Sequence, residues 1–225
     1  MSVKKNERLG LLGGSFDPVH NGHLALARAF GSAVEADRVL LLPAKEPPHK
    51  PGRKLANERD RLAMCRLAVE DDPALEASDL ELTLPAPSYT VNTLRALQKS
   101  RPGSALFLLC GGDMLLNLRH WKEFEAILRL CTVCAAPRGE DDRDRLTACA
   151  EEYHALGGQV QILDMKPVDL SSTDIRNKVG AGESIAGLVP KQVEEYILCR
   201  GLYRDASISD SGGSSLTNSG KHGLK

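Results

Sequence analysis

Two histidines, His20 and His23, stand in a glycine-rich loop near the start of the chain. The surrounding run is Gly13-Gly-Ser-Phe-Asp-Pro-Val-His-Asn-Gly-His-Leu24. A spacing of three residues puts both imidazoles on one side of the first turn of a helix. Two imidazole N–H groups directed at one anion can stabilise the negative charge that grows during phosphoryl transfer. We therefore expect His20 and His23 to be catalytic as hydrogen-bond donors, and not as nucleophiles.

The same loop carries the small residues that a phosphate site needs. Glycines let a backbone approach a phosphate closely, and the N–H groups at a helix start favour anions. Gly22 leaves room for a nucleotide against the backbone, and Ser15 adds a hydroxyl donor. The run is neither G-x-G-x-x-G nor a P-loop. A zinc pair or two structural histidines are the alternatives, but zinc takes three or four ligands and no third His or Cys has a suitable local spacing.

A second candidate anion site lies far downstream, in Leu170-Ser-Ser-Thr-Asp-Ile-Arg176. Serine and threonine are favoured at helix N-caps, and the free N–H groups of a helix start attract anions. The planar guanidinium of Arg176 suits phosphate oxygens. Taken alone, the run is also what an ordinary helix cap looks like.

Short apolar runs and amphipathic stretches alternate along the chain and must position these two motifs. The runs at 9–13, 38–42, 105–110, 130–136 and 160–163 predict buried strands. Helices are predicted at 23–30, 57–71, 90–99, 121–128, 141–156, 172–179 and 190–199. Asn57 is a candidate cap, and Pro190 suits a first helical turn. The alternation predicts an α/β fold, a Rossmann-like doubly wound parallel sheet with helices on both faces. Ligands then bind beyond the carboxyl ends of the strands.

Composition and charge exclude several other classes of protein. The net charge of −1 creates no overall field that attracts nucleic acid. No run of eighteen apolar residues is present and the first residues do not resemble a signal peptide, so we expect a cytoplasmic protein without a membrane span. We expect one domain over residues 1–204. Residues 205–225, rich in Ser and Gly, are expected to form a disordered tail.

Six scattered cysteines are too few for a disulfide framework in a chain of 225 residues. Cys131 and Cys134 have C-x-x-C spacing, but they lie in a predicted strand. Residues three apart on a strand point to opposite faces. We therefore expect reduced, mostly buried thiols and no redox or zinc site.

The first loop resembles the HxGH signature of the nucleotidyltransferase superfamily, and most closely that of bacterial nicotinate-nucleotide adenylyltransferases. The similarity extends in patches from Leu9 to about Tyr203, and the second motif resembles the family's Ser-Ser/Thr-Thr-x-x-Arg. The resemblance implies adenylyl transfer from ATP to nicotinate mononucleotide, giving nicotinate adenine dinucleotide and pyrophosphate in NAD biosynthesis. It implies Mg²⁺ on the triphosphate, held mainly by substrate oxygens and water, with no metal site in the protein.

The resemblance also assigns candidate binding residues. Asp113, at the end of a predicted strand, would accept hydrogen bonds from ribose hydroxyls or orient a phosphate-binding group. The residues implied to bind ATP are Gly13, Gly14, Ser15, Phe16, His20, Gly22, His23, Asp113, Ser172, Thr173 and Arg176.

A third set of residues is implied to bind the mononucleotide: Ser15, Lys50, Thr90, Trp121 and Arg138. Lys50 would face its phosphate, Thr90 would lie near the pyridine carboxylate, and Trp121 would stack on the ring. The alternatives are a solvated loop lysine, a helix cap at Thr90 and a core tryptophan. The preference for nicotinate over nicotinamide rests on the resemblance alone.

The expected partners are these two small molecules, with no nucleic acid and no membrane, and a homo-oligomer stays open. Phosphopantetheine adenylyltransferases and cytidylyltransferases are the nearest alternatives, but they are generally shorter and lack Pro-Pro-His-Lys50 and Pro87-Ser-Tyr-Thr90. A nicotinamide-preferring or bifunctional relative is a further alternative. A nucleotide-binding regulator without turnover is disfavoured by the intact histidines and Arg176.

Overall fold

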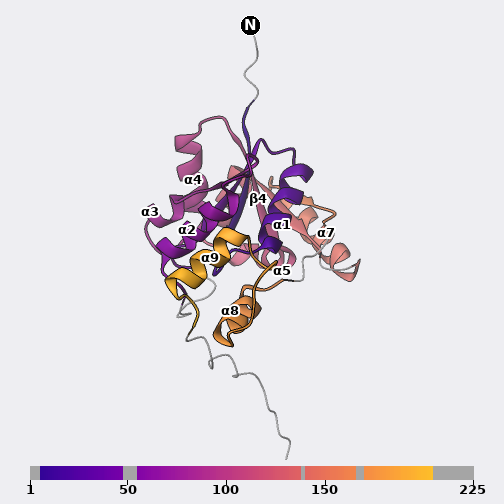
Figure 1. Cartoon of the computed structure of the whole chain (residues 1–225). Coiled ribbons are helices and arrows are strands. Elements are labelled where there is room, and N and C mark those ends of the chain that lie inside the picture. Colours follow the sequence, from indigo (N-terminus) through magenta and orange to yellow (C-terminus); the bar gives the residue numbers. More distant parts are fainter. Residues whose placement is uncertain (1–5, 48–54, 138–139, 166–169, 205–225) are drawn as a thin grey trace, which may run out of the picture.

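The computed structural model describes residues 6–47, 55–137, 140–165 and 170–204. A six-stranded parallel sheet with the order β3-β2-β1-β4-β5-β6 forms its centre (Figure 1). The strands are β1 (Arg8–Gly14), β2 (Arg38–Pro43), β3 (Leu75–Ala77), β4 (Ala105–Gly111), β5 (Thr132–Ala136) and β6 (Gln159–Ile162).

Helices cover both faces of this sheet, which confirms the predicted fold class. The helices are α1 (Asn21–Ala33), α2 (Glu58–Val69), α3 (Leu80–Thr83), α4 (Thr90–Ser100), α5 (Gly112–Leu116), the 3₁₀ helix η1 (Leu118–His120), α6 (Phe124–Leu130), α7 (Glu140–Ala155), α8 (Ser172–Gly180) and α9 (Lys191–Arg200). One core packs the sheet against α1, α2, α8 and α9. A second core packs the opposite face against α4, α5, α6 and α7.

Successive residues of a strand belong to these two cores in turn. In β1, Leu11 belongs to the second core and Leu12 to the first, as the two-residue period of a strand requires. The same rule separates the C-x-x-C pair, because Cys134 lies in the first core and Cys131 in the second. Both thiols are free, and burial raises the pKa of each. The expectation that both thiols are buried is therefore confirmed.

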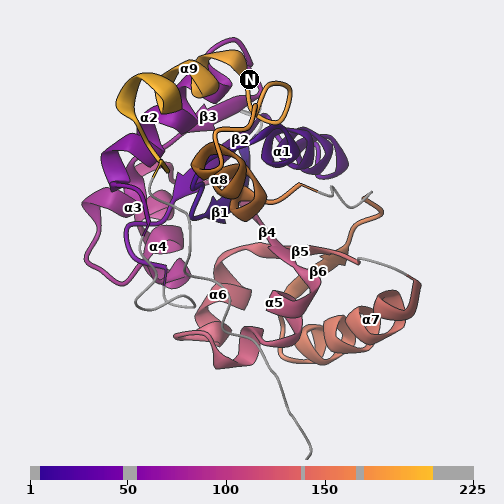
Figure 2. The same ribbon diagram turned by 60° about the horizontal axis from the view of Figure 1, so that its bottom comes forward.

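The carboxyl ends of β1 and β4 lie side by side at the centre of the sheet. The chain leaves β1 for α1 on one face and β4 for α5 on the other, which makes this a topological switch point. Figure 2 shows α8 beside the end of β1 and the start of α1. The two sequence motifs therefore meet at one edge of the sheet.

Helix α1 packs on the sheet without spare room. A Cβ atom on Gly10 of β1 would lie 2.9 Å from Val39 Cγ2 and 3.0 Å from Phe30 Cε1. A Cβ on Gly31 of α1 would lie 2.8 Å from the same Val39 methyl. The absence of two side chains thus sets how closely α1, with its histidines, approaches β1 and β2.

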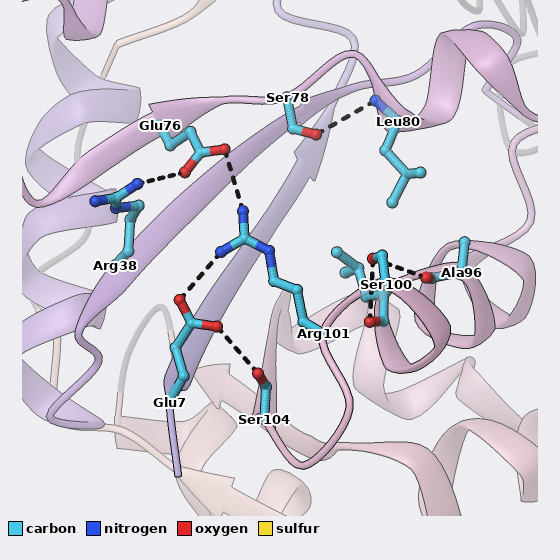
Figure 3. Close-up of polar contacts among 10 residues, drawn as sticks. Glu7, Arg38, Glu76, Ser78, Leu80, Ala96, Ser100, Arg101 and Ser104 are labelled. Atoms are coloured by element: carbon cyan, nitrogen blue, oxygen red, sulfur yellow. Dashed lines mark hydrogen bonds and ion pairs between the residues drawn. The ribbon is translucent and has the colours of Figure 1, made fainter. Parts of the chain in front are cut away.

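An ion-pair network lies beside the amino ends of β1 and β4 (Figure 3). Arg101 binds Glu7, just before β1, at 3.0 Å and Glu76 of β3 at 3.4 Å. Arg38 binds Glu76 at 2.8 Å, and the Ser104 hydroxyl donates to Glu7 at 3.0 Å. These side chains are partly exposed, so the network contributes modestly to stability. It joins the ends of the strands that lie opposite the motif loops.

All five predicted strands are present, and the three-residue β3 was not predicted. Asn57 caps α2 as expected. The helix predicted at 121–128 begins only at Phe124, because Glu123 adopts a left-handed backbone with φ of 52°. Pro190 is the N-cap of α9 and does not lie in its first turn. Among the described residues, no helix is long and apolar enough to cross a membrane. The tail expected at 205–225 lies outside the described residues.

Candidate active site

A cavity of about 530 Å³ opens at the carboxyl edge of the sheet, between the loop after β1 and the start of α8. All residues predicted to bind ATP line it except Gly13 and Asp113. His20, His23 and Arg176 therefore share one cleft, although more than 150 positions separate the histidines from the arginine in the chain. Asp17 and Leu26 from the first motif region, and Leu55, Leu170 and Ser171, complete the lining.

The two imidazoles are stacked, with ring centroids 3.6 Å apart and planes inclined by 21°. His20 is the N-cap of α1, and its Nδ1 accepts the His23 backbone N–H at 3.3 Å. The Nδ1 of His23 accepts the His20 backbone N–H at 3.2 Å in return. This is a capping box built from two histidines. Because each Nδ1 is an acceptor, the neutral rings carry their protons on Nε2.

His20 is 4% exposed, and burial lowers its pKa to about 4. The ring is therefore neutral at pH 7 and donates through Nε2–H. The edge of Phe16 packs against His23, with centroids 5.0 Å apart, and restrains the second ring. Two oriented neutral donors suit the stabilisation of a charged transition state.

Helix α8 is attached directly to the first loop. Ser171 is its N-cap and accepts the Thr173 N–H at 3.1 Å. The Ser172 hydroxyl donates to the Pro18 carbonyl at 2.9 Å. Arg176 donates to the Asp17 carbonyl at 2.7 Å and to Thr173 Oγ1 at 3.2 Å. The start of α8 and its arginine are thus fixed relative to the start of α1.

Arg61 of α2 supports the same loop from inside the protein, and it is only 1% exposed. Its guanidinium donates to the carbonyls of Ser15 at 2.7 Å, Ala44 at 2.7 Å and Ala56 at 3.1 Å. Burial lowers the pKa of Arg61 below its ordinary value, with nearby Asp17 opposing the shift. Arg61 therefore joins the loops that follow β1 and β2.

Asp17 is a buried carboxylate at the floor of the cavity, 2% exposed. Its Oδ1 accepts the Tyr203 hydroxyl at 2.8 Å and the Ala56 N–H at 3.1 Å. Its Oδ2 has no hydrogen-bond partner and lies 3.7 Å from Arg176 Nη1. Sequence analysis missed Asp17, Arg61 and Tyr203, although Asp17 stands within the first motif.

Of the described residues predicted to bind the mononucleotide, Ser15 lines this cavity, whereas Thr90 and Trp121 do not. The prediction that Thr90 caps α4 is wrong. The N-cap is Tyr89, whose extended backbone presents its carbonyl to the first helical N–H groups. Trp121 is half-buried beside the second core, and the Lys122 ammonium lies 4.5 Å from the Tyr89 ring centroid. The segments that carry Thr90 and Trp121 are therefore neighbours.

Four further residues were predicted to bind substrates, and none of them is among those that line the cavity as described. Asp113 is exposed in the first turn of α5 and does not line the cavity. Gly13 is exposed in β1, and a Cβ there would meet nothing within 4 Å. Lys50 and Arg138 lie outside the described residues.

A buried cluster around Glu81 fastens the Pro87–Thr90 segment to the loop after β2. The Thr93 hydroxyl donates to Glu81 at 2.9 Å. Ser88 Oγ accepts the Lys45 N–H at 2.9 Å, and the Ser88 N–H donates to the Glu46 carbonyl at 3.0 Å. Burial raises the pKa of Glu81 to about 7, while hydrogen bonds from Thr93 and Ser88 oppose the shift.

The described residues contain no group of three or more His, Cys, Asp or Glu side chains that could hold a metal ion. The cavity instead offers hydroxyls, ring and guanidinium N–H groups and the starts of two helices. These are anion-binding groups.

Comparisons with known proteins identify the family of this chain. The cytidylyltransferase-like family model matches residues 11–178. A protein of Synechococcus sp. (strain JA-3-3Ab) named "Probable nicotinate-nucleotide adenylyltransferase" is 41% identical over 201 residues, which are 89% of this chain and 97% of that protein. A protein of the same name from Roseiflexus sp. (strain RS-1) is 41% identical over 87% of this chain and 98% of its own.

A solved structure supports the fold independently of close sequence similarity. The nicotinic acid mononucleotide adenylyltransferase of Plasmodium falciparum, complexed with NaAD, has a TM-score of 0.69 and 16% identity. The match covers 88% of this chain and 98% of that one. By its sequence relatives and the family model together, this chain belongs to the nicotinate-nucleotide adenylyltransferase family of cytidylyltransferase-like proteins.

Proposed function

We propose that the protein transfers the adenylyl group of ATP to nicotinate mononucleotide, forming nicotinate adenine dinucleotide and pyrophosphate. The observation that carries this proposal is the meeting of His20, His23 and Arg176 in one cavity. The relatives named for this activity, and the Plasmodium enzyme solved with NaAD and with APC, support the choice of substrates.

The reaction needs positioning and charge stabilisation more than proton transfer. A 5′-phosphate oxygen of the mononucleotide attacks the α-phosphorus of ATP in line, and the bond to the β-phosphate oxygen breaks. The attacking phosphate is already anionic, so no general base is required. The Nε2–H groups of His20 and His23 donate to the α-phosphate oxygens as their charge grows, and neither ring changes its protonation state.

The leaving pyrophosphate lies at the start of α8. The Ser172 and Thr173 hydroxyls, the helix N–H groups and the Arg176 guanidinium hold its oxygens in our proposal. Arg176 is well placed, because its side chain is only 14% exposed and lines the cavity. Charge that moves onto the leaving group is then neutralised where it appears.

The mononucleotide binds towards α4 and the segment after η1. Trp121 stacks on its pyridine ring, and Thr90 and Ser15 contact its polar groups. Lys50 and Arg138 remain candidates for its phosphate, and Asp113 remains a candidate for ribose hydroxyls. The neighbouring positions of Tyr89 and Lys122 support a shared site for the segments that carry Thr90 and Trp121.

Mg²⁺ bound to ATP would be held by phosphate oxygens and water, and would neutralise part of the triphosphate charge. The hydroxyl and N–H donors of the cavity suit the phosphate oxygens, and these oxygens would in turn bind the ion. We propose the cytoplasm as the compartment, where thiols stay reduced.

The direct test is pyrophosphate release by the purified protein with Mg²⁺ and each substrate pair. We expect release with ATP and nicotinate mononucleotide, and much less with nicotinamide mononucleotide. Phosphopantetheine with ATP, or CTP in place of ATP, should give none. Preferred turnover with pantetheine, or ATP binding without turnover on any mononucleotide, would refute the proposal.

A further inference from the structure

Tyr203 stands near the end of the described chain, far in sequence from both motifs, yet it reaches the floor of the cavity. Gly201 caps α9 in a left-handed conformation with φ of 62°, and Tyr203 itself has φ of 64°. This turn returns the ring towards the first loop. The hydroxyl donates to Asp17 Oδ1 at 2.8 Å, and burial raises the pKa of Tyr203, so the donor proton is retained.

The two oxygens of the Asp17 carboxylate face different groups. Tyr203 and the Ala56 N–H both bind Oδ1. On the other side, Arg176 Nη1 lies 3.7 Å from Oδ2, beyond hydrogen-bond distance. That Nη1 donates to the Asp17 backbone carbonyl, and Nη2 donates to Thr173. A guanidinium has five N–H groups, so this arrangement keeps donors of Arg176 for an incoming anion.

We propose that Tyr203 is a positioning residue for ATP: its hydroxyl holds the Asp17 carboxylate away from Arg176 and so keeps Arg176 for the triphosphate. The inference rests on the proposed function, because it assumes a nucleoside triphosphate in this cavity. Without the hydroxyl, a buried carboxylate with one unpartnered oxygen gains a charge-assisted bond by closing on Arg176. The guanidinium then loses donors and net positive charge where the phosphates bind.

The chain contains a matched control. The Tyr196 hydroxyl of α9 also donates to an aspartate Oδ1 at 2.8 Å, that of Asp60. Both tyrosines are half-buried, but Tyr196 and Asp60 are not among the residues that line the cavity. Tyr203→Phe and Tyr196→Phe therefore remove the same kind of bond, and a purely structural role would affect both variants alike.

The experiment measures the affinity of the full-length protein for adenosine 5′-(α,β-methylene)triphosphate with Mg²⁺ by calorimetry. We expect Tyr203→Phe to bind roughly tenfold more weakly than wild type, the size of one lost charged hydrogen bond. Tyr196→Phe should bind like wild type, and both variants should unfold at similar temperatures. The KM for nicotinate mononucleotide should not change in Tyr203→Phe. Equal analogue affinity of the two tyrosine variants would overturn the inference.

Asp17→Asn gives an independent test, even if Tyr203→Phe does not fold. An amide cannot form the ion pair with Arg176, so this variant should bind the analogue at least as tightly as wild type. In the Asp17→Asn background, Tyr203→Phe should cause no further loss, as a double-mutant cycle measures. Weaker binding by Asp17→Asn, or a full tenfold loss in the double variant, would contradict the inference.

The same measurements separate this inference from the proposed function. A wild-type protein that does not bind the analogue would overturn both. Analogue binding with the expected Tyr203→Phe loss, but without pyrophosphate release on any pyridine mononucleotide, would overturn the proposed function and leave the inference standing.

Discussion

The rings of His20 and His23 lie 3.6 Å apart, and each Nδ1 accepts the backbone N–H of the other residue. The same two bonds begin helix α1 and select the ring tautomer. Protonation of either Nδ1 would replace an acceptor by a donor facing an N–H group. These contacts therefore leave Nε2 of each ring to face a ligand, and burial lowers the pKa of His20 so that this ring is neutral at pH 7.

Replacement of either histidine by alanine should cut turnover by roughly 10² or more, as loss of an oxyanion donor does. ATP affinity should fall less, because the growing charge belongs to the transition state. Pyrophosphate release and analogue binding measure the two effects. His20→Asn is the control for capping, since Asn is a good N-cap. The His20→Asn variant should be more stable than His20→Ala, but its turnover should stay slow. Full activity in any of these variants would remove the proposed roles.

The lowered pKa of His20 makes stability depend on pH. The unfolded ring titrates near 6.5 and the folded one near 4, so the unfolded state binds more protons between these values. The contribution of the neutral His20 ring to the stability of the fold is fully present above pH 6.5, and it is lost as the pH falls to 4. The shift corresponds to on the order of 3 kcal/mol. Urea unfolding of wild type and His20→Asn should therefore show a smaller loss for the variant between pH 6.5 and 4.5. If the stabilities of wild type and His20→Asn fell in parallel with pH, the lowered pKa of His20 would be contradicted.

Glu81 should make the stability of the protein depend on pH in the opposite direction to His20. Its folded pKa of about 7 lies above its usual 4.5, so the folded state holds the extra proton between these values. Its contribution to stability is present below pH 4.5 and is lost as the pH rises to 7. Glu81→Gln should thus gain stability relative to wild type from pH 5 to pH 8, by on the order of 3 kcal/mol. Glu125→Gln, on an exposed position of α6, should show no such trend.

Arg61→Met should destabilise the protein by roughly 3 kcal/mol or more, because buried carbonyl groups and Asp17 lose a cationic partner. Arg61→Lys keeps the charge but cannot bind three carbonyls with the same fork. We expect this second variant to fold and to show raised KM values for both substrates, since Arg61 joins both loops. Arg66→Lys is the control on an exposed position of α2. If Arg61→Lys changed the KM of only one substrate, the proposal that Arg61 supports both loops would be contradicted.

The sequence was informative where chemistry and periodicity are local. The apolar runs predicted the strands of the central sheet, and the carboxyl ends of parallel strands meet at one edge, so the meeting of two remote motifs was foreseeable. Strand β3 was missed because three residues, Leu75–Ala77, are too few to show a period. The cap at Thr90 was placed one residue late, since Tyr89 provides the helix start through its backbone alone.

The supporting contacts of the site were not predictable from pattern. Arg61 reaches Ser15 across 46 positions, and Tyr203 reaches Asp17 across 186. On a helix rich in charge, such as α2, a buried arginine looks like its solvated neighbours. Only the closure of the fold brings these partners together, and the predicted roles of Thr90, Trp121 and Asp113 still await measurement.

The contact between α1 and the sheet has a consequence for how activity can be lost. Gly10 and Gly31 do not line the cavity, yet an added methyl group at either position would overlap the Val39 side chain, so that α1 or the neighbouring side chains must shift. A displaced α1 would carry both imidazoles with it, because His20 caps this helix and His23 lies in its first turn. An inactivating change therefore need not lie in the cavity at all.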